Sequence, residues 1–170
     1  MTAVATPTRS RALAPADQPE QTFAPQISTA PVVAAVDGSA ASTAALDTAV
    51  RLAAEINTPL VFVYVRRGPA GFFGAPVYQR RLTKEIARAR CALDRALAVA
   101  DSAGVPAEGE ILEGSPRRRI SEFARDRGAR LIVVGSRRRK LRQSVSTGVL
   151  RTAGRPVIVA RSMPRPTAAA

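Results

Sequence analysis

Residues 131–161 read LIVVGSRRRKLRQSVSTGVLRTAGRPVIVAR, and this stretch decides the fold. It begins with a short apolar run, Leu131 to Val134, and it ends with a second one, Val157 to Ala160. Between them, Ser144 to Ala153 has its apolar residues at helical spacing, and Gly154 follows in the position that commonly ends a helix. A strand, a helix and a further strand in this order are typical of a βαβ unit with parallel strands.

The same alternation continues toward the N-terminus. Short runs, most of them nearly continuously apolar, predict three more strands at Val32 to Val36, Leu60 to Val65 and Ala107 to Leu112. Segments of helical period separate the strands, and their helices should begin near Ser39, Val77 and Ser115. We therefore expect an α/β fold, a single doubly wound domain from Pro31 to Arg161 with a five-stranded parallel sheet and helices on both faces.

The second predicted helix, Val77 to Ser102, is amphipathic. Its apolar stripe consists of Leu82, Ile86, Ala89, Leu93 and Leu97, and basic residues point the other way, at Arg80, Lys84, Arg88 and Arg95. Cys91 lies opposite the stripe, so we expect it to be exposed. It is the only cysteine, which rules out an internal disulfide and any need for an oxidising compartment.

The composition limits the chain to one domain with tails. Its 170 residues leave no room for a second full core, and residues 1–30 and 162–170, rich in Ala, Thr and Pro, are expected to be disordered. With 46% apolar but only 4% aromatic residues, the core must consist of Val, Ile, Leu and Ala. We find neither an apolar run long enough to span a membrane nor a secretory signal, which favours a soluble, cytoplasmic protein with no membrane partner.

The charge is strongly basic, with 26 Lys and Arg against 13 Asp and Glu. Anionic partners would explain this excess, and so would a compositional bias toward Arg and Ala. The chain has no histidine, which excludes Ser-His and Cys-His nucleophile systems and imidazole metal sites. We assign no catalytic residue and no metal ligand.

A ligand on such a sheet binds beyond the carboxyl ends of the strands, where the strand order reverses. This places Asp37, Gly38 and Ser39, which follow the first strand, near Gly135, which follows the fourth. Asp37 also has a structural interpretation, because an Asp between a strand and a helix often accepts hydrogen bonds from loop N–H groups. Ser39 is the expected N-cap of the first helix.

Three separated motifs, VVAAVDGS at 32–39, GSP at 114–116 and the stretch quoted first, resemble the universal stress protein family. The resemblance implies a sheet of order 3-2-1-4-5, of the adenine-nucleotide alpha-hydrolase-like type. It also implies a homodimer formed through the last strand, Val157 to Ala160. An apolar strand at a sheet edge is normally covered, which agrees with that expectation.

Some members of this family bind ATP, and the resemblance implies a contact to the nucleoside at Asp37 and Val65. Their phosphate loop has the pattern G-x2-G-x9-G-[ST], of which Gly135 and Ser144 match the two ends. Arg138 and Gln143 stand where the other two glycines belong, and the loop is five residues shorter. The candidate nucleotide-site residues are Asp37, Gly38, Ser39, Val65, Gly135, Ser136, Arg138, Gln143, Ser144, Val145 and Ser146.

The missing glycines matter because backbone N–H groups approach phosphate closely from dihedrals that other residues reach only at a cost. The loop instead offers an anion the side chains of Arg137, Arg138, Arg139, Lys140 and Arg142, and a second basic triplet, Arg117 to Arg119, begins the third helix. The main hypothesis is a non-enzymatic stress-response regulatory or binding domain in which ATP binding is weak, altered or lost. A genuine ATP-binding protein, with Mg²⁺ and slow hydrolysis, and a polyanion or nucleic-acid binder remain as alternatives.

Overall fold

The computed structural model describes residues 30–68, 75–136 and 144–161. Strands and helices alternate there as β1 (Val32–Ala35), α1 (Ala40–Glu55), β2 (Leu60–Arg66), α2 (Ala75–Ser102), β3 (Ala107–Glu113), α3 (Pro116–Asp126), β4 (Leu131–Ser136), α4 (Val145–Thr152) and β5 (Val157–Arg161). All strand pairs are parallel, in the order β3-β2-β1-β4-β5. The predicted fold and strand order are confirmed. The predicted disordered tails, up to residue 29 and from residue 162, lie outside the described residues.

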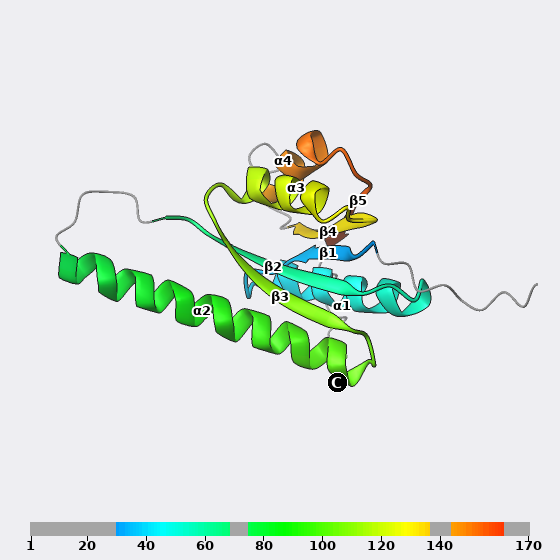
Figure 1. Cartoon of the computed structure of the whole chain (residues 1–170), viewed down its shortest axis with the longest axis horizontal. Coiled ribbons are helices and arrows are strands. Elements are labelled where there is room, and N and C mark those ends of the chain that lie inside the picture. Colours follow the sequence, from blue (N-terminus) through cyan, green and yellow to red (C-terminus); the bar gives the residue numbers. More distant parts are fainter. Residues whose placement is uncertain (1–29, 69–74, 137–143, 162–170) are drawn as a thin grey trace, which may run out of the picture.

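Helices cover both faces of the sheet (Figure 1). Helices α1 and α2 pack on one face over Val32, Leu60 and Phe62, and α3 and α4 pack on the other over Val33 and Val63. Because successive side chains of a strand point to opposite faces, β2 contributes its even-numbered residues to the first layer and its odd-numbered residues to the second. The sheet is buried on both faces, as its continuously apolar strands require.

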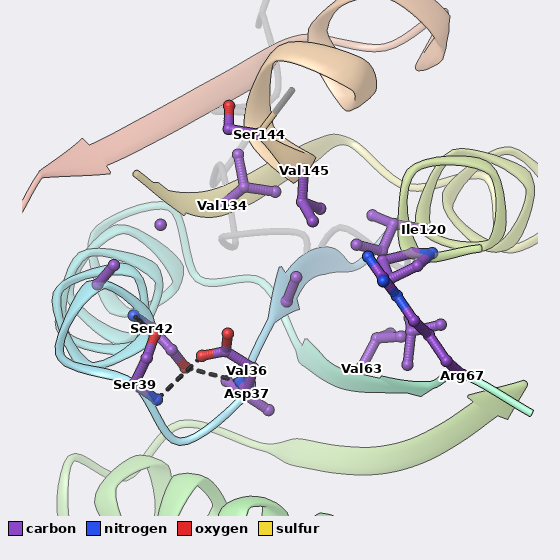
Figure 2. Close-up of a pocket in the computed structure, with 15 residues that line it drawn as sticks. Val36, Asp37, Ser39, Ser42, Val63, Arg67, Ile120, Val134, Ser144 and Val145 are labelled. Atoms are coloured by element: carbon purple, nitrogen blue, oxygen red, sulfur yellow. Dashed lines mark hydrogen bonds between the residues drawn. The ribbon is translucent and has the colours of Figure 1, made fainter. Parts of the chain in front are cut away.

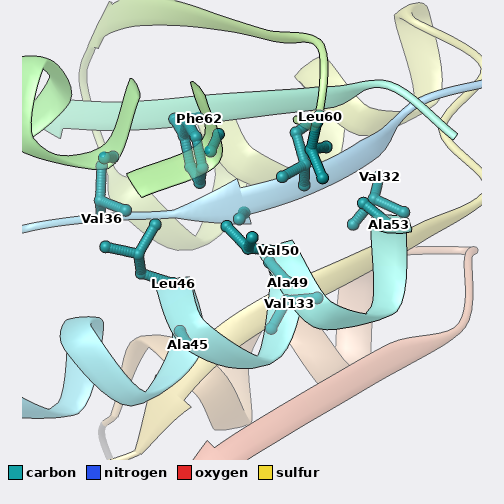
Figure 3. Close-up of a cluster of buried hydrophobic side chains, with 14 of the residues drawn as sticks. Val32, Val36, Ala45, Leu46, Ala49, Val50, Ala53, Leu60, Phe62 and Val133 are labelled. Atoms are coloured by element: carbon teal, nitrogen blue, oxygen red, sulfur yellow. The ribbon is translucent and has the colours of Figure 1, made fainter. Parts of the chain in front are cut away.

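The core consists mainly of small and β-branched side chains, as the composition predicts. Figure 3 shows the alanines of α1, among them Ala45, Ala49 and Ala53, lying against the strands. These three are at most 1% exposed, and their short side chains let the helix approach the sheet closely. Phe62 of β2 is the largest fully buried side chain.

The long helix α2 packs on the sheet with part of its predicted stripe, in which Ala89 and Leu93 are buried and Leu97 packs against the core. Its buried residues are Ala89, Leu93, Ala96 and Ala100, while the predicted Leu82, Ile86 and Leu97 are only half-buried. The first turns of α2 extend beyond the sheet and have no strand to pack on (Figure 1). Cys91 and the basic residues of the opposite side are exposed, as predicted. None of the helices within the described ranges combines the length and apolarity that crossing a bilayer demands.

The boundary after β4 also differs from the prediction. Gly135 and Ser136 are not loop residues, because they continue β4 and pair with Ala160 and Arg161 of β5. The loop that was predicted to begin at Gly135 therefore includes neither Gly135 nor Ser136. Its basic residues, Arg137 to Arg142, and Gln143 lie outside the described part of the chain.

Candidate functional site

A cavity of about 510 Å³ opens at the carboxyl ends of β1, β2 and β4 (Figure 2). Strand β1 lies between the other two, so this is the point where the strand order reverses and where ligands of such sheets bind. The cavity therefore lies at the place where the sequence predicts a ligand site. Six predicted site residues line it, namely Asp37, Ser39, Val65, Gly135, Ser144 and Val145.

Three of the predicted site residues that the structure describes, Gly38, Ser136 and Ser146, do not line the cavity. Gly38 is left out, and its φ of 75° shows that glycine is needed there for the turn. Ser136 ends β4, and Ser146, in the first turn of α4, is only 3% exposed. Arg138 and Gln143 lie outside the described residues.

Part of the cavity has an apolar lining. Val63 and Val65 from β2, Val134 from β4, Ile120 from α3 and Val145 from α4 all line it. Sequence reasoning did not assign Val63, Val134 or Ile120 to the site, because a valine under a ligand and a valine in the core look alike in a sequence. The other lining residues that it missed are Ala35, Val36, Ala41, Ser42, Arg67 and Pro116.

Two opposite charges stand on either side of this apolar part. Figure 2 shows Asp37 beside the start of α1 and Arg67 across the cavity, near Ile120. Arg67 follows β2 directly and lies two positions after Val65, so the alternation of β2 was a signal that could have revealed it. A ligand in the cavity would meet an acceptor on one side and a cation on the other.

Hydrogen bonds between residues that are close in the sequence hold the loop that carries Asp37. The backbone N–H of Ser39 donates to Asp37 Oδ1 at 2.9 Å, and the backbone N–H of Asp37 donates to Ser42 Oγ at 3.0 Å. Ser39 is the N-cap of α1, as predicted, and its Oγ accepts from the N–H of Ser42 at 3.3 Å. The structural interpretation of Asp37 is therefore correct, and its carboxylate is still exposed at the cavity.

The negative charge of Asp37 also affects the pKa of Tyr64. Burial raises the pKa of the Tyr64 phenol above 10.0, and the negative charges of Asp37 and Glu85 raise the pKa further, while Arg88 lowers it. The phenol of Tyr64 therefore stays protonated to a higher pH than that of a free tyrosine. Because Tyr64 packs with the α1 and α2 layer, it lies behind the cavity rather than in it.

Gly135 lies where β4 passes the N-terminus of α1. A Cβ on this residue would overlap the carbonyl oxygen of Ala41 and would lie 2.5 Å from the carbonyl carbon and 3.0 Å from the backbone nitrogen of Ser42. Close packing between strand and helix is thus sufficient reason for a glycine here. A bound phosphate is therefore not needed to explain the glycine at position 135.

Ser144 caps helix α4 at the other side of the cavity. Its Oγ accepts from the N–H of Thr147 at 3.2 Å and lies 2.9 Å from the hydroxyl of Ser146. By contrast, Ser115 occupies the N-cap position of α3 without a side-chain capping bond. Within the described ranges, no group of three or more Asp, Glu or Cys residues is arranged to hold a metal ion.

Comparison with known proteins gives a consistent result. The model of the universal stress protein family matches residues 29–161. Among solved structures, a protein of this family from Burkholderia pseudomallei is 32% identical, with 76% of this chain and 94% of that chain covered and a TM-score of 0.63. The universal stress protein UspA from Lactobacillus plantarum is 28% identical, with coverage of 78% and 97% and a TM-score of 0.69.

A third similar structure contains a nucleotide. It is the universal stress protein from Archaeoglobus fulgidus in complex with dAMP, 26% identical, with coverage of 77% and 97% and a TM-score of 0.61. The search of curated proteins finds no match.

Proposed function

Since this chain belongs to the universal stress protein family, we propose that it is a non-enzymatic stress-response binding domain whose cavity holds an adenine nucleoside monophosphate rather than ATP. The observation that carries the proposal is the cavity itself, which combines an apolar part with an acidic side chain at its edge. An apolar slot with a few placed polar groups is the usual form of a small-molecule site. The similar Archaeoglobus fulgidus protein in complex with dAMP supports this ligand class.

The two ends of the cavity suit the two parts of a nucleoside. Val65 and Val145, which are both half-buried, offer an apolar surface to a base, and the Asp37 carboxylate is an acceptor for sugar hydroxyls. Helix α1 and its capping bonds hold Asp37 in position before a ligand arrives. Such preorganisation lowers the ordering cost of binding.

The sequence does not support a backbone cradle for a triphosphate. Two of the three loop glycines are replaced, by Arg138 and Gln143. The remaining one, Gly135, is accounted for by its packing against Ala41. We therefore expect no gain in affinity at the cavity from a second or third phosphate, and no hydrolysis.

Calorimetric titration with AMP, dAMP and ATP tests the proposal. We expect AMP and dAMP to bind, and at 100 times the dissociation constant a ligand stabilises the fold by about 2.7 kcal/mol, which a melting curve detects. If millimolar AMP gives neither heat nor a shift in melting temperature, the proposal fails. Protein that retains stoichiometric ATP through purification would instead favour the ATP-binding alternative.

Replacing Asp37 by Asn is expected to weaken AMP binding roughly tenfold, because charge-assisted hydrogen bonds contribute about 1.5 kcal/mol or more than that. The amide oxygen of Asn can still accept from the N–H of Ser39, so the loop should keep its conformation. The matched control is Asp47→Asn, on the exposed side of α1, which removes the same charge away from the cavity. Equal affinities of the two variants would contradict the role of Asp37.

We also propose that the chain forms a homodimer through β5, Val157–Arg161. This strand is at the edge of the sheet, and its apolar residues Val157, Ile158 and Val159 are only half-buried. An exposed apolar edge strand is a surface that native proteins cover. We expect light scattering at micromolar concentration to give the mass of a dimer, and the mass of a monomer would overturn this expectation.

A further inference from the structure

A groove of about 500 Å³ lies between α3 and α4, which run side by side over one face of the sheet (Figure 1). Its lining in the described structure contains no aliphatic or aromatic residue, and consists of arginine, glutamate, serine, threonine and glycine. The charged residues are Arg117, Arg118, Arg125 and Arg151 against the single carboxylate of Glu122. Four positive charges and one negative charge leave the groove with a net charge of +3, whereas the charges of Asp37 and Arg67 balance in the neighbouring cavity.

The one carboxylate is already paired at the edge of the groove. Arg118 Nε lies 2.6 Å from Glu122 Oε1, and Arg119, which is outside the lining, contributes a second contact of 3.1 Å to Glu122 Oε2. Arg125 has only a loose contact, 3.8 Å, with Asp126. Arg118 and Arg125 thus each contact a carboxylate, while the described lining as a whole keeps its net charge of +3.

The position of Arg117 depends on a glycine in the opposite helix. A Cβ on Gly148 of α4 would overlap Cδ of Arg117 and lie 2.5 Å from its Cγ and 3.0 Å from its Cβ. The aliphatic part of the Arg117 side chain therefore lies against the backbone of α4. Close approach at Gly148 is what brings this arginine into the groove.

One contact between two hydroxyl groups of the groove lining links α3 to α4. The hydroxyls of Ser121 on α3 and Thr152 on α4 are 2.9 Å apart. Ser121 and Thr152 also contact the carbonyl oxygens of Arg117 and Gly148, one turn earlier in each helix, both at 3.0 Å. The part of the groove that Ser121 and Thr152 form is therefore held in place before any ligand binds.

Helix stability does not explain Arg117, whereas Arg125 and Arg151 lie in the last turns of α3 and α4, where the helix dipole favours cations, and Arg118 pairs with Glu122. Arg117 and Arg118 are in the first turn of α3, where the helix dipole disfavours cations, and that turn contains no acidic residue. Guanidinium groups are well matched to phosphate, which they bind through two parallel hydrogen bonds. Because the lining has no aromatic residue to stack on a base, the groove fits phosphate groups better than nucleobases.

We propose that the α3–α4 groove binds chains of linked phosphate groups, such as inorganic tripolyphosphate, at a site separate from the nucleotide cavity. A concave hollow of this size accepts a few linked phosphates and excludes the wide surface of a duplex. This site does not depend on the proposed nucleotide function. Ser144 lines both hollows, so the test must separate free phosphate chains from the phosphate tail of a nucleotide bound in the cavity.

The experiment measures tripolyphosphate binding to the full chain by calorimetry at about 50 and 200 mM salt. We expect binding that weakens steeply with salt, as phosphate contacts do. The variant Arg117→Gln with Arg151→Gln should lose at least roughly tenfold in affinity. The control variant, Arg90→Gln with Arg95→Gln, makes the same change of charge on the exposed side of α2, away from the groove. Its affinity for tripolyphosphate should stay within about twofold of that of the unaltered protein.

A second variant, Gly148→Ala, keeps every charge and displaces Arg117. Alanine is favourable in a helix, so α4 should still form, and tripolyphosphate binding should weaken. Saturating AMP and the Asp37→Asn substitution should both leave tripolyphosphate affinity unchanged, which keeps the test independent of the cavity.

Four results would overturn the proposal. They are no binding of tripolyphosphate at low salt, an equal loss in the α2 control, displacement by AMP, and tighter binding of duplex DNA that the groove variant abolishes. Displacement by AMP would assign the phosphate to the cavity, and the DNA result would make nucleic acid the partner.

Discussion

Replacing Gly135 by Ala should destabilise the domain by about 3 kcal/mol, the upper end of the usual cost of overpacking a core. The added Cβ would overlap the carbonyl group of Ala41. Because the atoms of Ala41 that the Cβ would meet belong to the backbone, no side-chain rotation relieves the clash. Helix α1 must therefore move away from β4. Thermal unfolding should show a fall in melting temperature of roughly 10 °C for a domain of this size.

The control for this variant is Gly109→Ala, in the middle of β3. There a Cβ would meet only the side chain of Leu93, at 3.4 Å or more, which is an ordinary contact. Neither glycine has a positive φ, so the two substitutions differ in packing and not in backbone strain. A loss at Gly135 no larger than at Gly109 would show that α1 and β4 do not meet as the structure indicates.

Replacing Val65 by Trp is expected to abolish AMP binding, with a loss of affinity of roughly 100-fold or more. Val65 is half-buried on the side of β2 that faces the cavity, so an indole here would occupy the space of a base. One hundredfold corresponds to about 2.8 kcal/mol, comparable to the apolar contacts that an excluded base would lose. The chain has no tryptophan, so the fluorescence of the variant reports directly whether the new side chain is shielded from water.

The matched control is Val99→Trp on α2. Val99 is 39% exposed and lies outside the cavity, so this variant should bind AMP normally. Its fluorescence should be that of a solvent-exposed tryptophan. Normal AMP binding by a folded Val65→Trp protein would place the nucleotide elsewhere. Melting curves of both variants separate a blocked site from a damaged fold.

The site was predictable to the extent that it depends on the ends of strands. Asp37, Ser39 and Ser144 follow strands or begin helices, and such positions have recognisable residue types. Val63, Val134 and Ile120 were missed, because burial in a core and burial under a ligand select the same apolar residues. Arg67 was missed although the alternation along β2 points to it.

The groove was less accessible to prediction. The triplet Arg117 to Arg119 is visible in the sequence, and its place in the first turn of α3 was correctly predicted. Arg151 and Gly148 belong to another helix, and no local pattern pairs them with Arg117. Only the packing of α3 against α4 brings these residues to one surface.

The sequence by itself determined the five parallel strands, the four helices and the end of the sheet where the cavity opens. Apolar runs, helical spacing and capping residues are properties of neighbours in the chain, so they can be read without a structure. The tertiary structure alone decided that Gly135 belongs to β4 and meets α1, which valines line the cavity, and that Arg117 lies over Gly148. Each of these depends on how closely two distant backbones approach, a distance that the full set of packed side chains sets.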